Sequence, residues 1–141
     1  MISPGLYQRV STYPALAAIG DNWFPGGLPE GADLPAGIYT CISRVRIFTQ
    51  DGGGPFDTRY QLDIYSEDFD ECEALINALD KAMHGYRGTI TVGGVDYVIK
   101  ASLFDNGLGP NLQPTGRRSD GPEPGFFRAT HDYKIFHSEV T

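Results

Sequence analysis

Two aspartates are the residues of this sequence best suited to acid–base chemistry. Asp63 and Asp132 each stand inside a segment of alternating apolar and polar residues, the period expected of a half-buried strand. If these strands are neighbours, both carboxylates can meet on one sheet face, and a carboxylate pair can act as general acid and base. The same positions also fit a structural interpretation, in which the carboxylates are exposed or pair with Arg59 and Arg128.

Other reactive groups lack the spacing that a catalytic or metal site needs. His131 and His137 are six residues apart on a predicted strand, about 20 Å at the usual rise per residue, so they cannot share one metal ion without a bend. The glycines at 52–54 lack the Lys-Ser/Thr ending of a phosphate-binding loop. Cys41 and Cys72 are too few for a metal framework, and we expect two free thiols. The sequence therefore predicts no enzyme activity, no metal and no cofactor.

The clearest structural pattern is a strand that leads directly into a helix, between Thr58 and Gly85. Apolar residues alternate up to Ser66 and then change to helical spacing. The helical stripe consists of Cys72, Leu75, Ile76, Leu79, Ala82 and Met83. Acidic residues crowd the start of this helix, and Gly85 suits the left-handed residue that ends one. We therefore expect a sheet that carries an outer helix packed through this stripe.

The remaining segments extend this pattern to the whole chain. We expect a first helix at Leu6–Ile19, bent or split at Pro14, and strands at Ile38–Phe48, Gly88–Val92, Val95–Phe104 and Phe126–His137. The apolar parity slips partway along the first strand, which indicates either a bulge near Ser43 or burial of both faces. The predicted class is α+β, with a small, mostly antiparallel sheet of four to five strands, two helices packed on one side, and the order α-β-β-α-β-β-β.

Length and charge limit the classes of function. The 141 residues predict a single domain spanning 1–141, and the net charge of −7 disfavours general binding to nucleic acid or anionic membranes. The N-terminus lacks the basic and apolar stretches of a signal peptide, and no apolar run is long enough to span a membrane. We therefore expect synthesis in a cytoplasm.

One long connection stands out as a candidate interaction element. Residues 105–125 are rich in Gly and Pro, join two predicted strands, and carry two adjacent arginines in an otherwise acidic protein. We expect either a projecting loop or arm that orders against another subunit, or a disordered segment. The candidate interface residues are Arg117, Arg118, Asp105, Asn106 and Asp51.

Three stretches resemble the tail-completion proteins of long-tailed bacteriophages. These proteins, also called tail terminators, occur as well in prophages and gene transfer agents. The first likeness is a short helix followed by a crossing segment with aromatic residues and prolines, and then by a strand. The second is a strand with a central Asp that leads into a helix. The third is a closing strand with an Arg near its start and Asp-Tyr in its middle. The stretches are Leu6–Ser43, Tyr60–Met83 and Phe127–Glu139, about half of the chain.

The resemblance implies a structural role in a virion. Identical subunits, six if they match the tail, would form a ring on the head-proximal end of the tail tube. The ring would stop tube growth and join the tail to the head connector. Its partners would be further copies of this chain, the tail tube protein and the connector protein. DNA would pass through its lumen without specific binding, and assembly would occur in the cytoplasm of a host bacterium. The alternative is a small-molecule-binding or hydrolytic α+β domain that uses the Asp63/Asp132 side of the sheet.

Overall fold

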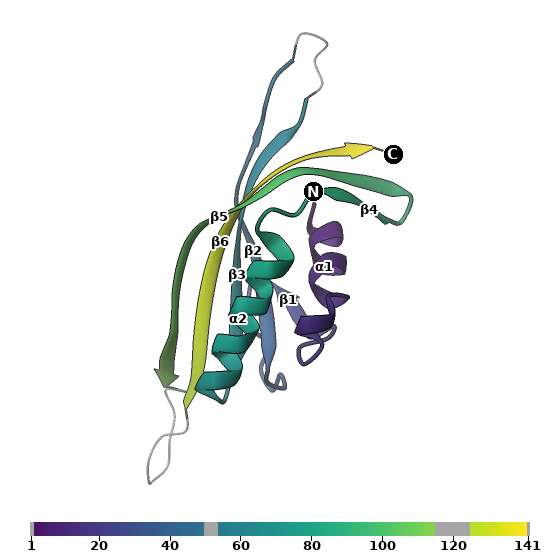
Figure 1. Ribbon diagram of the computed structural model, residues 1–141. Helices are drawn as coiled ribbons and strands as arrows, with labels where there is room; N and C mark the ends of the chain where they lie inside the picture. Colours follow the sequence, from purple (N-terminus) through teal and green to yellow (C-terminus); the bar gives the residue numbers. More distant parts are fainter. Residues whose placement is uncertain (1, 50–53, 115–124, 141) are drawn as a thin grey trace.

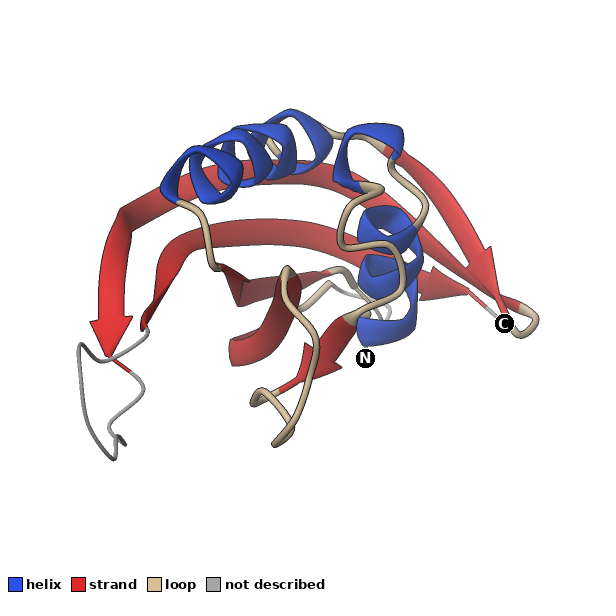
Figure 2. Ribbon diagram, turned by 90° about the horizontal axis from the view of Figure 1, so that it is seen from below, coloured by secondary structure: helices blue, strands red, loops and turns tan. Residues whose placement is uncertain are grey.

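The protein forms a curled six-stranded sheet with two helices on one of its faces (Figures 1 and 2). The computed structural model describes residues 2–49, 54–114 and 125–140. In chain order the elements are α1 (Ser3–Ser11), a 3₁₀ turn (Pro14–Leu16), β1 (Trp23–Pro25), β2 (Ala36–Arg46), β3 (Phe56–Ser66), α2 (Phe69–Met83), β4 (Gly88–Val92), β5 (Val95–Pro114) and β6 (Gly125–Val140). No helix in the described part of the chain is long and apolar enough to cross a membrane.

The expectation of a small sheet with four to five strands is wrong. The strand order is β1-β2-β3-β6-β5-β4, and the sheet is mixed, because β1 runs parallel to β2 while every other neighbouring pair is antiparallel. The missing element in the predicted order is β1, whose three residues carry no alternating pattern long enough to recognise. The long outer strands bend into an arch, so the sheet is a curled half-barrel rather than a flat layer (Figure 2).

A tryptophan and a glycine explain why β1 joins the sheet. Trp23 is buried and pairs with Gly37 of β2, and a Cβ added at Gly37 would lie only 2.1 Å from the indole ring. Only glycine leaves room for the ring at this position. The aromatic crossing segment predicted from the sequence is therefore anchored by its tryptophan, but as a parallel strand.

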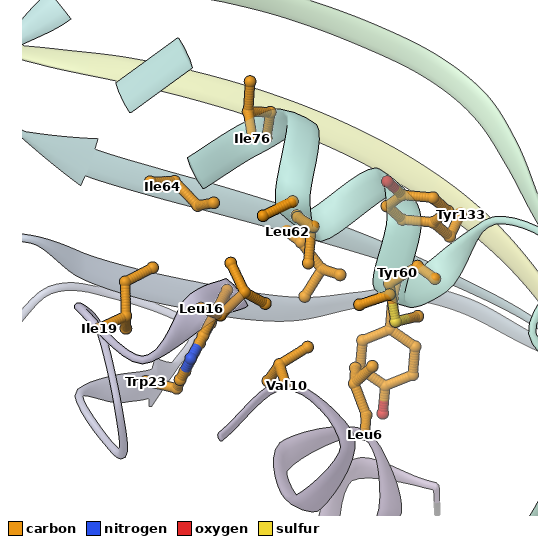
Figure 3. Close-up of a cluster of buried hydrophobic side chains, with 14 of the residues drawn as sticks. Leu6, Val10, Leu16, Ile19, Trp23, Tyr60, Leu62, Ile64, Ile76 and Tyr133 are labelled. Atoms are coloured by element: carbon orange, nitrogen blue, oxygen red, sulfur yellow. The ribbon is translucent and has the colours of Figure 1, made fainter. Parts of the chain in front are cut away.

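The second helix packs through the predicted stripe. Asp68 caps its start by accepting a hydrogen bond from the backbone N–H of Glu71 at 3.0 Å, and Gly85 follows its end with φ of 78°. Its stripe is buried against β3, β5 and β6, with Leu79 fully inaccessible. Figure 3 shows how the core side chains of this layer converge from the sheet and from both helices.

The first helix is shorter than predicted. It ends at Ser11, and Pro14 begins a separate 3₁₀ turn, because proline cannot continue the helical hydrogen bonding. The apolar residue Leu16 is nevertheless fully buried. Arg9 donates two hydrogen bonds, of 2.9 and 3.0 Å, to the carbonyl oxygen of Ala82, which ties α1 to the last turn of α2.

Two long hairpins leave the centre of the sheet in opposite directions (Figure 1). The β2–β3 hairpin contains a register shift between Cys41 and Ser43, which supports the bulge among the two explanations that the sequence left open. The β5–β6 hairpin is longer than expected, because residues 105–114 continue β5 and pair with β6 down to Gly125. The predicted loop or arm at 105–125 therefore begins as paired strand, because backbone pairing continues where side-chain alternation ends, and residues 115–124 lie outside the described residues.

Candidate functional site

The carboxylate of Asp63 is occupied by structural contacts. It lies on the helix-free face of the sheet and is only 3% exposed. Arg128 approaches it at 3.1 Å through Nε and again through Nη2, and Thr130 and Gln61 also donate hydrogen bonds to it. A carboxylate held by a guanidinium, a hydroxyl and an amide is suited to fixing strand pairing, and it has little freedom to transfer protons.

Asp132 does not form an opposed pair with Asp63. The register places Asp63 opposite Thr130 and Asp132 opposite Gln61, so the two carboxylates are diagonal neighbours. Burial raises the pKa of Asp132, because the charged form loses hydration, although the nearby guanidinium of Arg59 opposes this effect. The arrangement favours the structural interpretation of these aspartates over acid–base chemistry.

The predicted interface residues fall into two groups. Asp105 forms an ion pair with Arg59 across β6, and Asn106 lies opposite Asp132 at the exposed edge of β5. The remaining candidates, Arg117, Arg118 and Asp51, lie outside the described residues. The structure thus places two of the five on one strand edge.

The helix-free face is charged yet internally compensated. Besides the pairs made by Arg59 and Arg128, Lys134 lies 3.9 Å from Asp57 on the same face. Each ion pair links neighbouring or next-nearest strands of the sheet. Such pairs stabilise a wet surface only slightly, but they leave little uncompensated positive charge to hold a polyanion.

A wide groove lies beside α1. Its volume is about 560 Å³, within the range of ligand pockets. It is lined by Ser3, Pro4, Tyr7, Gln8, Ser11, Thr12, Tyr39 and Val92. None of these side chains is a carboxylate, imidazole, amine or thiol, so the groove lining itself offers its serine and threonine hydroxyls none of the usual activating bases. Within the described chain, no cluster of three His, Cys, Asp or Glu side chains is placed to hold a metal ion.

The base of the β2–β3 hairpin holds a cluster that sequence reasoning did not identify. The guanidinium carbons of Arg44 and Arg46 lie 3.9 and 4.5 Å from the ring centroid of Phe56, which also stacks on His137 at 5.6 Å. The imidazole Nε2 of His137 is hydrogen-bonded to the hydroxyl of Thr58 at 2.9 Å. Burial lowers the pKa of His137 to about 4. Both guanidinium groups lie within cation–π distance of the Phe56 ring, an attraction that favours this arrangement where the hairpin leaves the body.

Large apolar side chains are exposed mainly on the two hairpins. On β2 and the segment after it they are Ile42, Val45, Ile47 and Phe48, and on β5 they are Leu103, Phe104, Leu108 and Leu112. Phe48 is 82% exposed and Leu108 is 65% exposed. Apolar residues gathered in this way mark interaction surfaces more often than isolated ones do. The hairpins, rather than any pocket, are therefore the candidate functional surfaces.

Comparison with known proteins finds a shared fold but no sequence family. No protein-family model matches the sequence, and no curated protein sequence matches it. Among solved structures, a chain from the virion of a native gene transfer agent particle matches 96% of this chain and 92% of its own length, with a TM-score of 0.61 and 12% identity. At this identity the match establishes the fold, which this chain shares over nearly its whole length with a component of a phage-like particle.

Proposed function

We propose that this protein is a structural component of a phage-like virion and that it acts as a tail terminator. The observation that carries the proposal is the shared fold, because it covers both chains almost completely and the neighbour is part of a gene transfer agent particle. A single shared motif would not give coverage of 96% of this chain and 92% of the other. Fold alone does not determine function, so the surfaces must support the role independently.

The surfaces agree with an assembly role rather than with catalysis. The strongest acid–base candidate, Asp63, is held in an ion pair with Arg128. The apolar side chains that remain exposed are concentrated on two projecting hairpins, where they contribute little to the core. We therefore propose a protein without enzyme activity whose hairpins contact other subunits of the same particle.

In the proposed arrangement, six copies form a ring on the head-proximal end of the tail tube. The ring ends tube growth and connects the tail to the head connector, while DNA passes through the lumen. The net charge of −7 is consistent with this passage, because a negative surface does not retain DNA. Arg117 and Arg118 are proposed to contact carboxylates of a neighbouring subunit or tail protein.

Deleting the gene tests the proposal through the shape of the particles. Electron microscopy of the deletion strain should show tails of uncontrolled length and heads without tails, and expression of the intact chain should restore normal particles. A chain with the destabilising change Leu79→Ala serves as the control for loss by misfolding. Normal particles from the deletion strain would contradict the proposed function.

A further inference from the structure

Two exposed apolar surfaces lie at opposite ends of the subunit (Figure 1). The first, which we call the tip surface, lies at the end of β2 and just beyond it, and consists of Ile42, Val45, Ile47 and Phe48. The second, which we call the base patch, lies at the start of α2 and consists of Phe69, Leu112 and Phe127. The strand β3 runs from one end to the other, and its 11 residues span about 33 Å at the usual rise per residue. One subunit therefore cannot bring its own two surfaces together.

The base patch is a continuous apolar surface on the helix-bearing face of the sheet. The rings of Phe69 and Phe127 meet edge to face, with centroids 5.6 Å apart. Leu112 is opposite Phe127 in the register, and directly opposed residues of neighbouring strands lie on the same face. Phe69 is 41% exposed and Leu112 is 61% exposed. The three side chains therefore offer a partner an apolar contact that the core does not use.

Carboxylates lie beside the base patch. Residues 67–73 include five acidic residues and no basic one. Two of the five serve the helix start, because Asp68 caps α2 and Glu71 accepts a hydrogen bond from Ser66. The other three are exposed, and within the described chain none lies within ion-pair distance of a Lys or Arg: they are Glu67, Asp70 and Glu73. The base patch therefore favours a partner that presents apolar and basic side chains together.

The tip surface has both of these properties. Phe48 is 82% exposed, and Arg44 and Arg46 precede it on β2. Residues 40–49 contain no acidic residue. Arg44 lies 3.9 Å from Glu139, whereas Arg46 has no carboxylate within that distance in the described part of the chain. Aromatic and arginine side chains are among those that contribute most to the affinity of protein interfaces.

We propose that the tip surface of one copy of this chain docks on the base patch of the next copy. Phe48 of one copy then lies against Leu112 of the next. Arg46 faces Glu73, which is one helical turn from Phe69. The contact joins unlike surfaces at opposite ends of the subunit, so its repetition closes into a ring when the rotation permits. This inference rests on the proposed ring and identifies the surfaces that build it.

Disulfide trapping tests the apolar centre of the contact. Phe48→Cys and Leu112→Cys are prepared as separate proteins in a Cys41→Ser background, and Cys72 is retained because it is buried. Mixed at high concentration and oxidised, the two variants should form the dimer linked between positions 48 and 112 at least fivefold above either homodimer.

The control for this trap replaces Leu112→Cys with Leu108→Cys. Leu108 is on the same strand and is similarly exposed, at 65%, but the register places it opposite Thr130 on the helix-free face. Its mixture with Phe48→Cys therefore sets the level of random contact. Homodimers in excess, or a yield at position 112 equal to this control, would overturn the proposal.

A charge exchange within the trapped pair tests the polar part of the contact. Arg46→Glu, added to the Phe48→Cys protein, should lower the dimer yield at least threefold, because it places a carboxylate against Glu73. Glu73→Arg, added to the Leu112→Cys protein, should restore the yield, and a change in one protein cannot rescue misfolding of the other. Lys81→Glu, an exposed charge reversal in the last turn of α2, is the matched control and should leave the yield unchanged. Failure of Glu73→Arg to restore the yield would overturn the proposal.

The outcome for the docking is separable from that for the proposed function. A ring at the head–tail junction whose subunits do not form the engineered disulfide overturns the docking and leaves the terminator role in place. Formation of that disulfide with no copies in particles supports the docking and contradicts the terminator role.

Discussion

The helix-covered body and the projecting hairpins use apolar residues for different purposes. In the body, the apolar side chains of β3, β6 and α2 are almost completely buried, and they account for much of the core in Figure 3. On the hairpins, residues of the same type remain exposed: Leu108 on β5 by 65%, and Phe48, just after β2, by 82%. The body therefore holds the apolar core, while the hairpins carry exposed apolar surface of the kind that marks interaction sites.

A core truncation should have the largest effect on stability. Leu79→Ala should lower the free energy of unfolding by about 2–5 kcal/mol, because a fully buried leucine leaves a cavity between α2 and the sheet. Leu108→Ala on the β5 hairpin is the matched control and should change stability by less than ~0.5 kcal/mol. Urea unfolding of both variants gives the comparison. Equal losses of unfolding free energy in the two variants would contradict the distinction between body and hairpin.

Removing the buried carboxylate on the helix-free face should have the next largest effect. Asp63→Asn should cost about 1–3 kcal/mol, because the Arg128 guanidinium loses its charged acceptor. Asp57→Asn is the control, since its ion pair with Lys134 is 3.9 Å long and more exposed, and it should cost less than ~1 kcal/mol. Thermal unfolding of the two variants measures the difference, and a smaller loss for Asp63→Asn would contradict its assigned role.

Acid should weaken the hairpin base through His137. The folded-state pKa of about 4 lies below the ordinary value near 6.5, so the unfolded chain takes up a proton first as the pH falls. This residue's contribution to stability is therefore complete above pH 6.5 and is lost between about pH 6.5 and 4, at up to ~1.4 kcal/mol per pH unit. Urea midpoints across this range, compared with those of His137→Gln, should diverge; parallel curves would exclude this role for His137.

The smallest effect on stability is expected from the arginine pair beyond β5. Changing both Arg117 and Arg118 to alanine should alter the free energy of unfolding by less than ~0.5 kcal/mol, because neither lies in an apolar stripe of the sequence. The same variant should produce tails of abnormal length or tails that do not join heads. Electron microscopy that shows normal infectious particles would indicate that this segment has no part in assembly.

The body could be predicted from the sequence because its burial is periodic. The Leu79 stripe and the bulge near Ser43 follow from side-chain spacing, and the structure contains both. The strand β1 could not be found in this way, because three residues are too few for a period and the signal lies in the fit of Trp23 onto Gly37. The continuation of β5 could not be predicted either, because its pairing depends on backbone groups, which side-chain patterns do not reveal.

Candidate site residues were harder to predict than elements. The sequence singles out Asp63 and offers Arg128 as one possible partner, but only the three-dimensional arrangement shows that this arginine occupies the carboxylate. The ion pair of Arg59 with Asp105 joins residues that are 46 positions apart, and no local pattern links them. Val45 and Leu103 are exposed because the described helices cover only the other face of the sheet (Figure 2), which is a property of the whole fold.

Electron cryomicroscopy of particles produced by cells that encode this chain tests the central claim most directly. The account predicts a sixfold ring of this fold at the junction of head and tail, with DNA in the lumen. A map of the junction that contains no copy of this chain would contradict the account.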